Sequence, residues 1–111
     1  MMMFQPEHVA PILSGRKTET RRLWKSQRVK VGSIQKAKLK MFSKDSFAHI
    51  RILGVWQERL GDISEESVWA EGYDTLEEYK GVLERVNKRR HLVWDDDLAV
   101  WAVKFELMAK S

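Results

Sequence analysis

The stretch Ala99-Val100-Trp101-Ala102-Val103-Lys104-Phe105-Glu106-Leu107 alternates in polarity and decides the fold class. Its odd-numbered residues are all apolar, whereas two of the even-numbered ones, Lys104 and Glu106, are charged. Side chains of a strand point alternately to its two faces, so this pattern predicts a strand with one face buried. We therefore expect a long strand over residues 99–107.

A second strand is expected over residues 48–56, where the alternation continues but both sides become apolar toward the end. This change indicates a strand that is buried on two faces there. The pattern places Ala48, Ile50, Ile52 and Trp56 on one side and His49, Arg51, Leu53 and Val55 on the other.

A third strand is expected over residues 33–42, directly after Gly32, which marks a turn. Apolar and basic residues alternate without interruption in this segment. The pattern predicts that Ala37, Leu39 and Met41 face inward and that Lys36, Lys38 and Lys40 face outward.

The segment before these strands predicts a short strand over residues 2–5 followed by one helix. Pro6 suits the first turn of a helix, and Val9, Ile12 and Leu13 then fall on one face. Gly15 is expected to end this helix.

Two more helices are expected between the strands at 48–56 and 99–107. Asp62 or Ser64 can cap a short helix over residues 65–70 that ends at Gly72. Thr75 followed by Glu78 is a capping box, and apolar residues then recur at helical spacing. This spacing is typical of a helix that packs on a core, and the stripe comprises Leu76, Tyr79, Val82, Leu83 and Val86.

Strands that flank a two-helix insert indicate an α+β fold around a small β-barrel or strongly bent sheet, with helices beside it. The periodicity does not choose between a closed barrel and an open sheet. The 111 residues contain no repeat, low-complexity tract or Gly/Ser-rich linker, so residues 1–111 are expected to form a single domain.

Composition excludes several classes of protein. No apolar run is long enough to span a bilayer, and residues 1–4 lack the features of a signal peptide, so a soluble, cytoplasmic protein is expected. The absence of cysteine excludes disulfides, thiol catalysis and thiolate metal sites. His8, His49 and His91 have no paired ligand spacing, so neither a metal nor a cofactor is predicted. Nothing in the sequence indicates an oligomeric state.

The net charge of +4 is unevenly distributed along the chain. Residues 16–51 contain 12 Lys or Arg against two acidic residues, whereas residues 52–111 have a net charge of −5. Such a basic block suits a polyanion, because cations that neutralise phosphates release condensed counterions. The alternative is that these charges only keep the surface solvated and protect strand edges.

Residues 15–22, Gly-Arg-Lys-Thr-Glu-Thr-Arg-Arg, form the densest polar segment. The arginines have the forked geometry that suits phosphate. Neighbouring cations lower the pKa of a lysine, so Lys17 is a candidate general base for a threonine nucleophile. A straight strand, however, would place Lys17 and Thr20 on opposite faces. The alternative is a charged edge strand in which Glu19 pairs with Lys17 or Arg21.

Two further residues are functional candidates. Glu71 lies at the end of a predicted helix, where the helix dipole disfavours a carboxylate, so either a cationic partner or plain solvation is expected. Trp24 follows Arg21 and Arg22, and an aromatic residue among cations suits base stacking as well as simple packing.

The sequence resembles the ASCH domain, a member of the PUA-like superfamily. The resemblance extends over nearly the whole chain in the family's order, including Val31-Gly32. Its main motifs are Ile12 to Arg22, Leu60-Gly61-Asp62-Ile63-Ser64, Ala70-Glu71-Gly72-Tyr73 with Leu76-Glu77-Glu78-Tyr79, and Val103 to Leu107. It implies a PUA-like β-barrel with helices around a cleft and an association with RNA or modified nucleosides.

Some small relatives are amidohydrolases that remove the acetyl group of N4-acetylcytidine, and others have been described as ribonucleases. In the amidohydrolases, a lysine acts as base, a threonine three residues later as nucleophile, and a glutamate of the insert assists. The resemblance assigns these roles to Lys17, Thr20 and Glu71. The chain departs from the family pattern at Ser33, where many relatives have aspartate. It also departs in the alternating lysines Lys36, Lys38 and Lys40, which are not part of that pattern.

Three functions follow from these observations. The first is binding of RNA or a nucleoside through a basic cleft around residues 15–40. The second is hydrolysis of N4-acetylcytidine by Lys17, Thr20 and Glu71. The third is a non-enzymatic regulatory module for a small ligand or a protein. The residues expected to bind nucleic acid are Arg16, Arg21, Arg22, Trp24, Lys36, Lys38 and Lys40.

Overall fold

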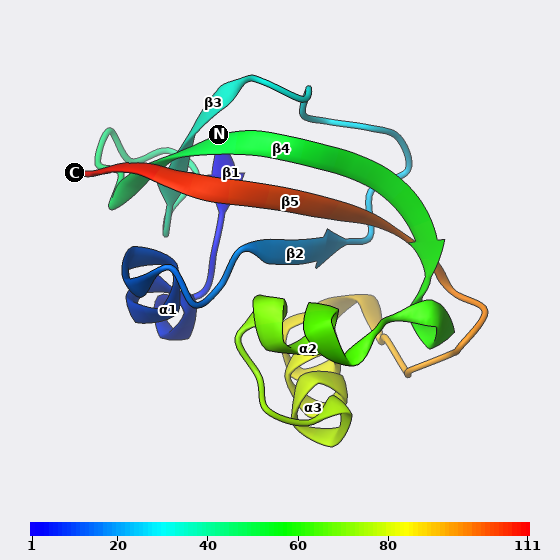
Figure 1. Cartoon of the computed structure of the whole chain (residues 1–111). Coiled ribbons are helices and arrows are strands. Elements are labelled where there is room, and N and C mark those ends of the chain that lie inside the picture. Colours follow the sequence, from blue (N-terminus) through cyan, green and yellow to red (C-terminus); the bar gives the residue numbers. More distant parts are fainter.

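A computed structural model describes all residues, 1–111, and contains a single five-stranded sheet (Figure 1). The strands lie in the order β1-β3-β4-β5-β2. The sheet is strongly curled, and Figure 1 shows the helices gathered on one side of it. The expected α+β fold is confirmed, in the form of a curled half-barrel. The strands are β1 (Met2–Met3), β2 (Glu19–Arg22), β3 (Ile34–Lys38), β4 (Ala48–Arg59) and β5 (Ala99–Lys110).

The long antiparallel pair β4 and β5 forms the centre of the sheet, and both strands extend beyond the predicted ranges. Their register shifts between Ile52 and Gly54, which is a β-bulge. A bulge adds one residue on one strand, so the alternation of faces reverses after it. Val55 therefore packs against the barrel core. The expectation that Trp56 shares a face with Ile52 is wrong for this reason.

Strand β3 is shorter than expected, because the chain leaves the sheet after Lys38. Its pairing with β4 ends at Ala37, and only Met2 and Met3 of β1 pair with its other edge. Leu39 and Met41 were expected to face inward but are 41% and 55% exposed. An alternating pattern cannot show where the partner strand ends, and residues 39–42 have no partner.

The helices begin and end close to the expected residues. A short 3-10 turn (Pro6–His8) leads into α1 (Val9–Ser14), which ends at Gly15 with φ 82°. Ser64, and not Asp62, caps α2 (Glu65–Glu71), and Gly72 follows with φ 109°. Helix α3 (Leu76–Val86) begins at Thr75, whose hydroxyl accepts a hydrogen bond from the backbone N–H of Glu78. Two further 3-10 turns cover Leu60–Asp62 and Lys88–Arg90.

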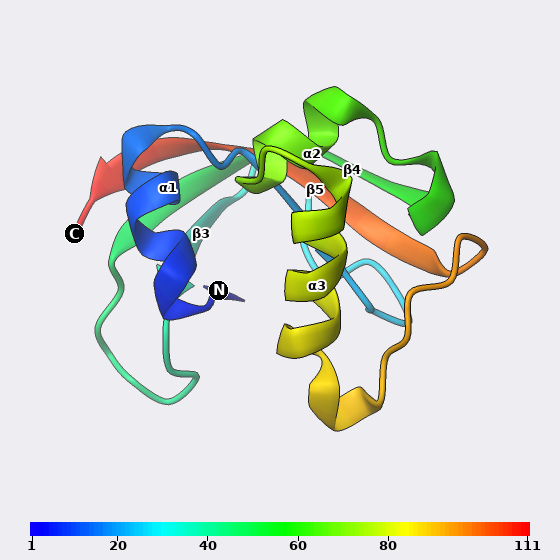
Figure 2. The same cartoon turned by 90° about the horizontal axis from the view of Figure 1, so that it is seen from below.

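The apolar residues form two separate clusters. One fills the inside of the half-barrel and includes Phe4, Ile50 and Phe105. The other lies between the sheet and the insert, where Tyr79 and Leu83 of α3 pack with Leu60, Val68 and Val100. Figure 2 shows α1 and α3 from below, with the N-terminal strand between them in this view. No helix is both long and apolar enough to cross a bilayer.

The half-barrel is open between its two edge strands, β1 and β2. A side chain bridges this opening: the Arg22 guanidinium donates a hydrogen bond of 2.7 Å to the backbone oxygen of Met3. The same guanidinium lies 4.9 Å from the centre of the Phe4 ring. Because the two edges are linked only by side chains, a hollow can form there.

Candidate functional site

Lys17 is held inside the protein by the turn that follows α1. The backbone N–H of Lys17 donates a hydrogen bond to the backbone oxygen of Pro11. The next N–H, of Thr18, donates one to the backbone oxygen of Ala70 in α2. The Lys17 side chain is only 2% exposed, and its ammonium donates three hydrogen bonds. The acceptors are the backbone oxygens of Glu19 and Glu71, at 2.8 and 2.9 Å, and Glu71 Oε1, at 2.9 Å. Burial lowers the pKa of Lys17, while the Glu71 carboxylate opposes this shift.

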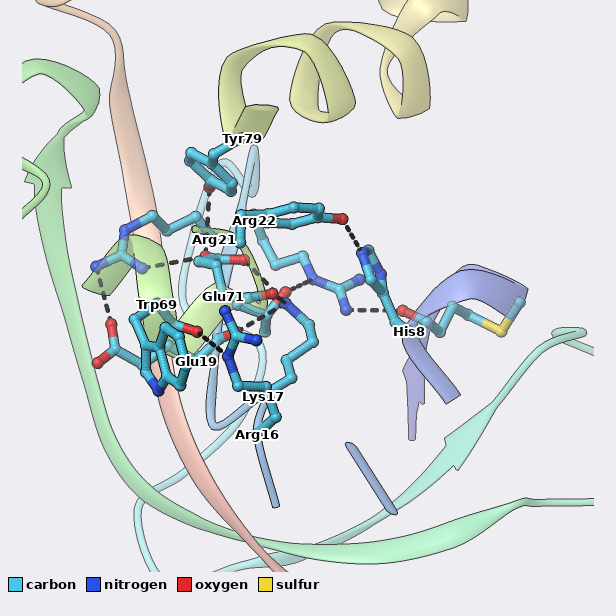
Figure 3. A network of polar contacts seen from close by, with 12 residues as sticks. His8, Arg16, Lys17, Glu19, Arg21, Arg22, Trp69, Glu71 and Tyr79 are labelled. Carbon is cyan, nitrogen blue, oxygen red and sulfur yellow. Dashed lines mark hydrogen bonds and ion pairs between the residues drawn. The ribbon is translucent and has the colours of Figure 1, made fainter. Parts of the chain in front are cut away.

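Glu71 receives cations on both carboxylate oxygens, as Figure 3 shows. Oε1 pairs with Lys17, and Oε2 accepts from Arg21 Nη1 at 3.0 Å and from the Tyr79 hydroxyl at 3.3 Å. Of the two alternatives that the sequence left open for Glu71, a cationic partner or plain solvation, the structure shows the first, with two cations. Tyr79 was expected only to pack, yet its hydroxyl belongs to this cluster. Burial and Glu71 raise the pKa of Tyr79 well above its ordinary value.

Arg21 is buried among three carboxylates. Its Nη1 pairs with Glu71, its Nη2 with Glu19 at 3.0 Å, and its Nε with Glu58. Burial alone would lower the pKa of Arg21, but Glu71 and Glu58 raise it above its ordinary value. A phosphate at this guanidinium would meet three negative charges, so the geometry does not favour the expected phosphate contact. Sequence reasoning missed Glu58, which is brought here by β4.

Thr20 and Arg22 lie together on β2. Thr20 is 6% exposed, and its Oγ1 accepts a hydrogen bond of 3.2 Å from Arg22 Nε. Burial lowers the pKa of Arg22 to about 10. No hydrogen bond links Thr20 to Lys17, which lies before β2 and donates instead to Glu19 and Glu71.

Lys17, Thr20 and Glu71 nevertheless line one hollow of about 580 Å³ between β1, β2 and α3, which we call the cleft. This volume is within the range of small-molecule sites. Aromatic rings of Phe4, Trp24, Tyr73 and Tyr79 line it together with Arg22 and His8.

His8 contributes an uncharged imidazole to the wall of the cleft. Its Nε2 lies 2.6 Å from the Tyr73 hydroxyl. Burial, with a smaller contribution from Lys17, lowers the pKa of His8 to about 4. Burial likewise raises the pKa of Tyr73 to about 12, so both groups are neutral at neutral pH.

The remaining predicted binding residues are not all in the cleft. Arg16 lies outside it: its guanidinium is 3.3 Å from the centre of the Trp69 ring and pairs with Asp74 at 3.1 Å. Trp24 and Arg22 do line the cleft, whereas the three lysines do not. Lys36 is exposed on β3, Lys38 donates to the Ser43 backbone oxygen at 2.7 Å, and Lys40 follows the strand.

Three cations in the cleft lining were missed by sequence reasoning, namely Arg28, Arg89 and Arg90. The available signal was the basic triplet Lys88-Arg89-Arg90, which stands in the otherwise acidic half of the chain. No group of three or more His, Cys, Asp or Glu residues is arranged to hold a metal ion.

Comparisons with known proteins support the fold. No family model and no curated protein matches the sequence. Among solved structures, an Enterococcus faecalis protein of the DUF984 family is 22% identical, with a TM-score of 0.74 over 97% of this chain and 75% of the other. An ASCH domain from Lactobacillus crispatus is 17% identical, with a TM-score of 0.65 over 89% and 69%.

The ASCH protein of Zymomonas mobilis is 15% identical, with a TM-score of 0.60 over 98% of this chain and 66% of the other. Sequence identities this low establish shared architecture and no shared activity. The resemblance of the sequence motifs and the agreement of the structures point to the same architecture. In its fold, the chain is an ASCH-like domain.

Proposed function

We propose that the cleft binds a nucleoside, either free or as part of an RNA strand. The observation that carries this proposal is the composition of the cleft wall. Aromatic rings suited to stacking a flat base lie beside hydrogen-bonding groups, notably the buried Thr20 and Lys17 and the half-buried Arg22. Single-stranded bases are recognised by this combination of aromatic stacking and polar contacts to the base edge.

The charges of the cleft agree with such a ligand. Lys17 and Arg21 already pair with carboxylates, whereas Arg22 has no ion pair and bonds only Thr20 and the Met3 oxygen. Its guanidinium bonds Thr20 and lies 4.9 Å from the centre of the Phe4 ring. Arg22 is therefore assigned to the ligand and Arg21 to the support of Glu71.

The test is a titration of the protein with each of the four ribonucleosides. NMR spectra recorded during the titration monitor the indole signal of Trp24. Saturable shifts confined to residues of the cleft are expected. The variant Trp24→Leu should weaken binding about 10-fold or more, because stacking of one base contributes about 1–3 kcal/mol. The exposed Trp69 offers a matched control, since Trp69→Leu removes an indole outside the cleft. Equal weakening by both variants, or no shifts at all, contradicts the proposal.

A second candidate function, hydrolysis of an acetylated cytosine amide, is favoured by one observation: Lys17, Thr20 and Glu71 line the same cleft. In this reaction Thr20 Oγ bonds the acetyl carbon, and its proton passes to Lys17. The bond from carbon to N4 then breaks, and the proton moves to the leaving amine. Water subsequently hydrolyses the acetyl-threonine ester.

The protonation state of Lys17 decides whether this reaction can occur. Three acceptors surround Lys17 Nζ, which suits an ammonium donating three hydrogen bonds, a form that has no free lone pair. Burial lowers the pKa of Lys17 toward the neutral amine that the reaction requires, while the Glu71 carboxylate opposes this shift. Incubation with N4-acetylcytidine should release cytidine, Thr20→Ser should retain activity, and Thr20→Ala should lose it. Activity that survives Thr20→Ala would assign the nucleophile to another residue.

A further inference from the structure

The cleft lining is strongly unbalanced in charge. Its residues include six that are cationic, namely Lys17, Arg21, Arg22, Arg28, Arg89 and Arg90, and a single carboxylate, Glu71. Glu71 and the neighbouring Glu19 and Glu58 pair with the first two of these cations. The other four arginines form no ion pair.

Three of these four arginines come from two segments that are far apart in the sequence, and all three line the cleft. Arg28 precedes the buried Val29 in the segment between β2 and β3, and Arg89 and Arg90 belong to the 3-10 turn after α3. All three are exposed. We call Arg28, Arg89 and Arg90 the arginine rim.

The rim is partly ordered by contacts with the backbone. Arg90 Nη1 donates to the oxygen of Leu23, at 3.3 Å, and thereby joins the end of the insert to the segment after β2. Arg89 also lines a neighbouring hollow with Lys88 and Gln5, so the positive surface continues outward from the cleft. The dipole of α3 favours cations at its C-terminal end, which accounts for the triplet Lys88–Arg90 but not for Arg28.

We infer that the ligand of the cleft carries a phosphate group, which the arginine rim binds. This inference rests on the proposed function and specifies its ligand as a nucleotide and not a free nucleoside. An uncharged nucleoside would leave the three guanidinium groups without a counter-charge. Guanidinium forks match the geometry of phosphate oxygens, and such charge-assisted hydrogen bonds are the stronger ones.

The experiment compares dissociation constants, measured by calorimetry at fixed ionic strength, for the four ribonucleosides and their 3′- and 5′-monophosphates. At least one monophosphate should bind about 10- to 100-fold more tightly than its nucleoside, as one charge-assisted hydrogen bond can provide. The double variant Arg89→Gln/Arg90→Gln should remove this advantage, so that the monophosphates bind no more tightly than the nucleosides. Arg28→Gln should reduce it separately.

The matched control is Lys104→Gln/Lys110→Gln, which removes two positive charges from exposed positions of β5 outside the cleft. It should keep the preference for phosphate. A short single-stranded trinucleotide identifies the source of the phosphate, since tighter binding than the monophosphates assigns the rim to an RNA chain.

Three other outcomes would contradict this inference, and they differ in what they mean for the proposed function. Equal affinities for nucleosides and monophosphates overturn the inference and leave nucleoside binding standing. Absence of binding by every probe overturns both. An equal loss of phosphate preference in the β5 control also overturns the inference, because it shows a general effect of net charge.

Discussion

Replacing Glu71 by glutamine is the most direct perturbation of the buried cluster. Glu71 is 3% exposed and contacts Lys17 at 2.9 Å, Arg21 at 3.0 Å and the Tyr79 hydroxyl at 3.3 Å. Glutamine keeps the size of the side chain and one acceptor oxygen. It removes the negative charge and turns an amide N–H₂ toward groups that are themselves donors.

The expected loss of stability depends on which cation loses its ion-pair partner. Removing one member of a buried ion pair destabilises a protein by about 3–5 kcal/mol, since the remaining charge is uncompensated. Arg21 keeps Glu19 and Glu58 in the variant, so the loss falls mainly on Lys17. We therefore expect Glu71→Gln to lower the free energy of unfolding by about 3 kcal/mol, at the lower end of this range.

The assay is urea unfolding at pH 7, followed by far-UV circular dichroism. Glu106→Gln is the control, because its carboxylate is 48% exposed and lies 3.8 Å from Arg51. Loss of such a surface pair should cost at most about 1 kcal/mol. The double variant Lys17→Met/Glu71→Leu removes both charges and should recover much of the stability lost by Glu71→Gln. A loss below about 1 kcal/mol for Glu71→Gln would refute the reasoning that this carboxylate offsets Lys17.

Four further predictions concern pH dependence, backbone conformation and helix capping. The pKa of His8 falls from 6.5 to about 4 on folding, so the unfolded chain binds more protons between these values. Stability should therefore decrease as pH falls through this window, and His8→Asn should flatten a plot of urea midpoint against pH. Gly81→Ala, in the interior of α3 with open space around it, should raise stability by about 0.5–1 kcal/mol in urea unfolding. Gly72→Ala should lower it by about 1–2 kcal/mol, because φ is +109°. Thr75→Ala should cost about 1 kcal/mol, measured in the same way, through loss of the cap of α3.

Local patterns predicted the elements well because they depend on neighbouring residues. Alternation identified the paired strands, and Gly15, Gly72 and Thr75 marked helix boundaries correctly. The limits of β3 were wrong because strand length depends on the partner, and residues 39–42 have none. The predicted side of Trp56 was wrong because a bulge at Leu53, between Ile52 and Gly54, reverses the alternation, and such a bulge needs one extra residue and no special motif.

Tertiary pairing limited the prediction of the site. The position of Glu71 at a helix end indicated a cationic partner, yet the identity of that partner depends on contacts 50 or more residues apart. Counting charges along the chain placed the predicted binding surface in the basic segment, residues 16–51. In the fold, Arg21 of that segment is surrounded by carboxylates, while Arg89 and Arg90 from the acidic half reach the cleft.

The buried charges themselves argue for a function in the cleft. Burying an ion pair costs desolvation, and apolar residues of similar volume often give equal or greater stability. The fold could therefore close this space with a Leu or Met at position 17, yet it holds a lysine with three acceptors there. Lys17 and Glu71 also line the cleft, where the Arg22 side chain joins the two edges of the half-barrel. Lys17 and Glu71, which are only 2% and 3% exposed, form a polar inner wall of this hollow. An apolar core at this place would fill the hollow and leave Thr20 and Arg22 without polar surroundings.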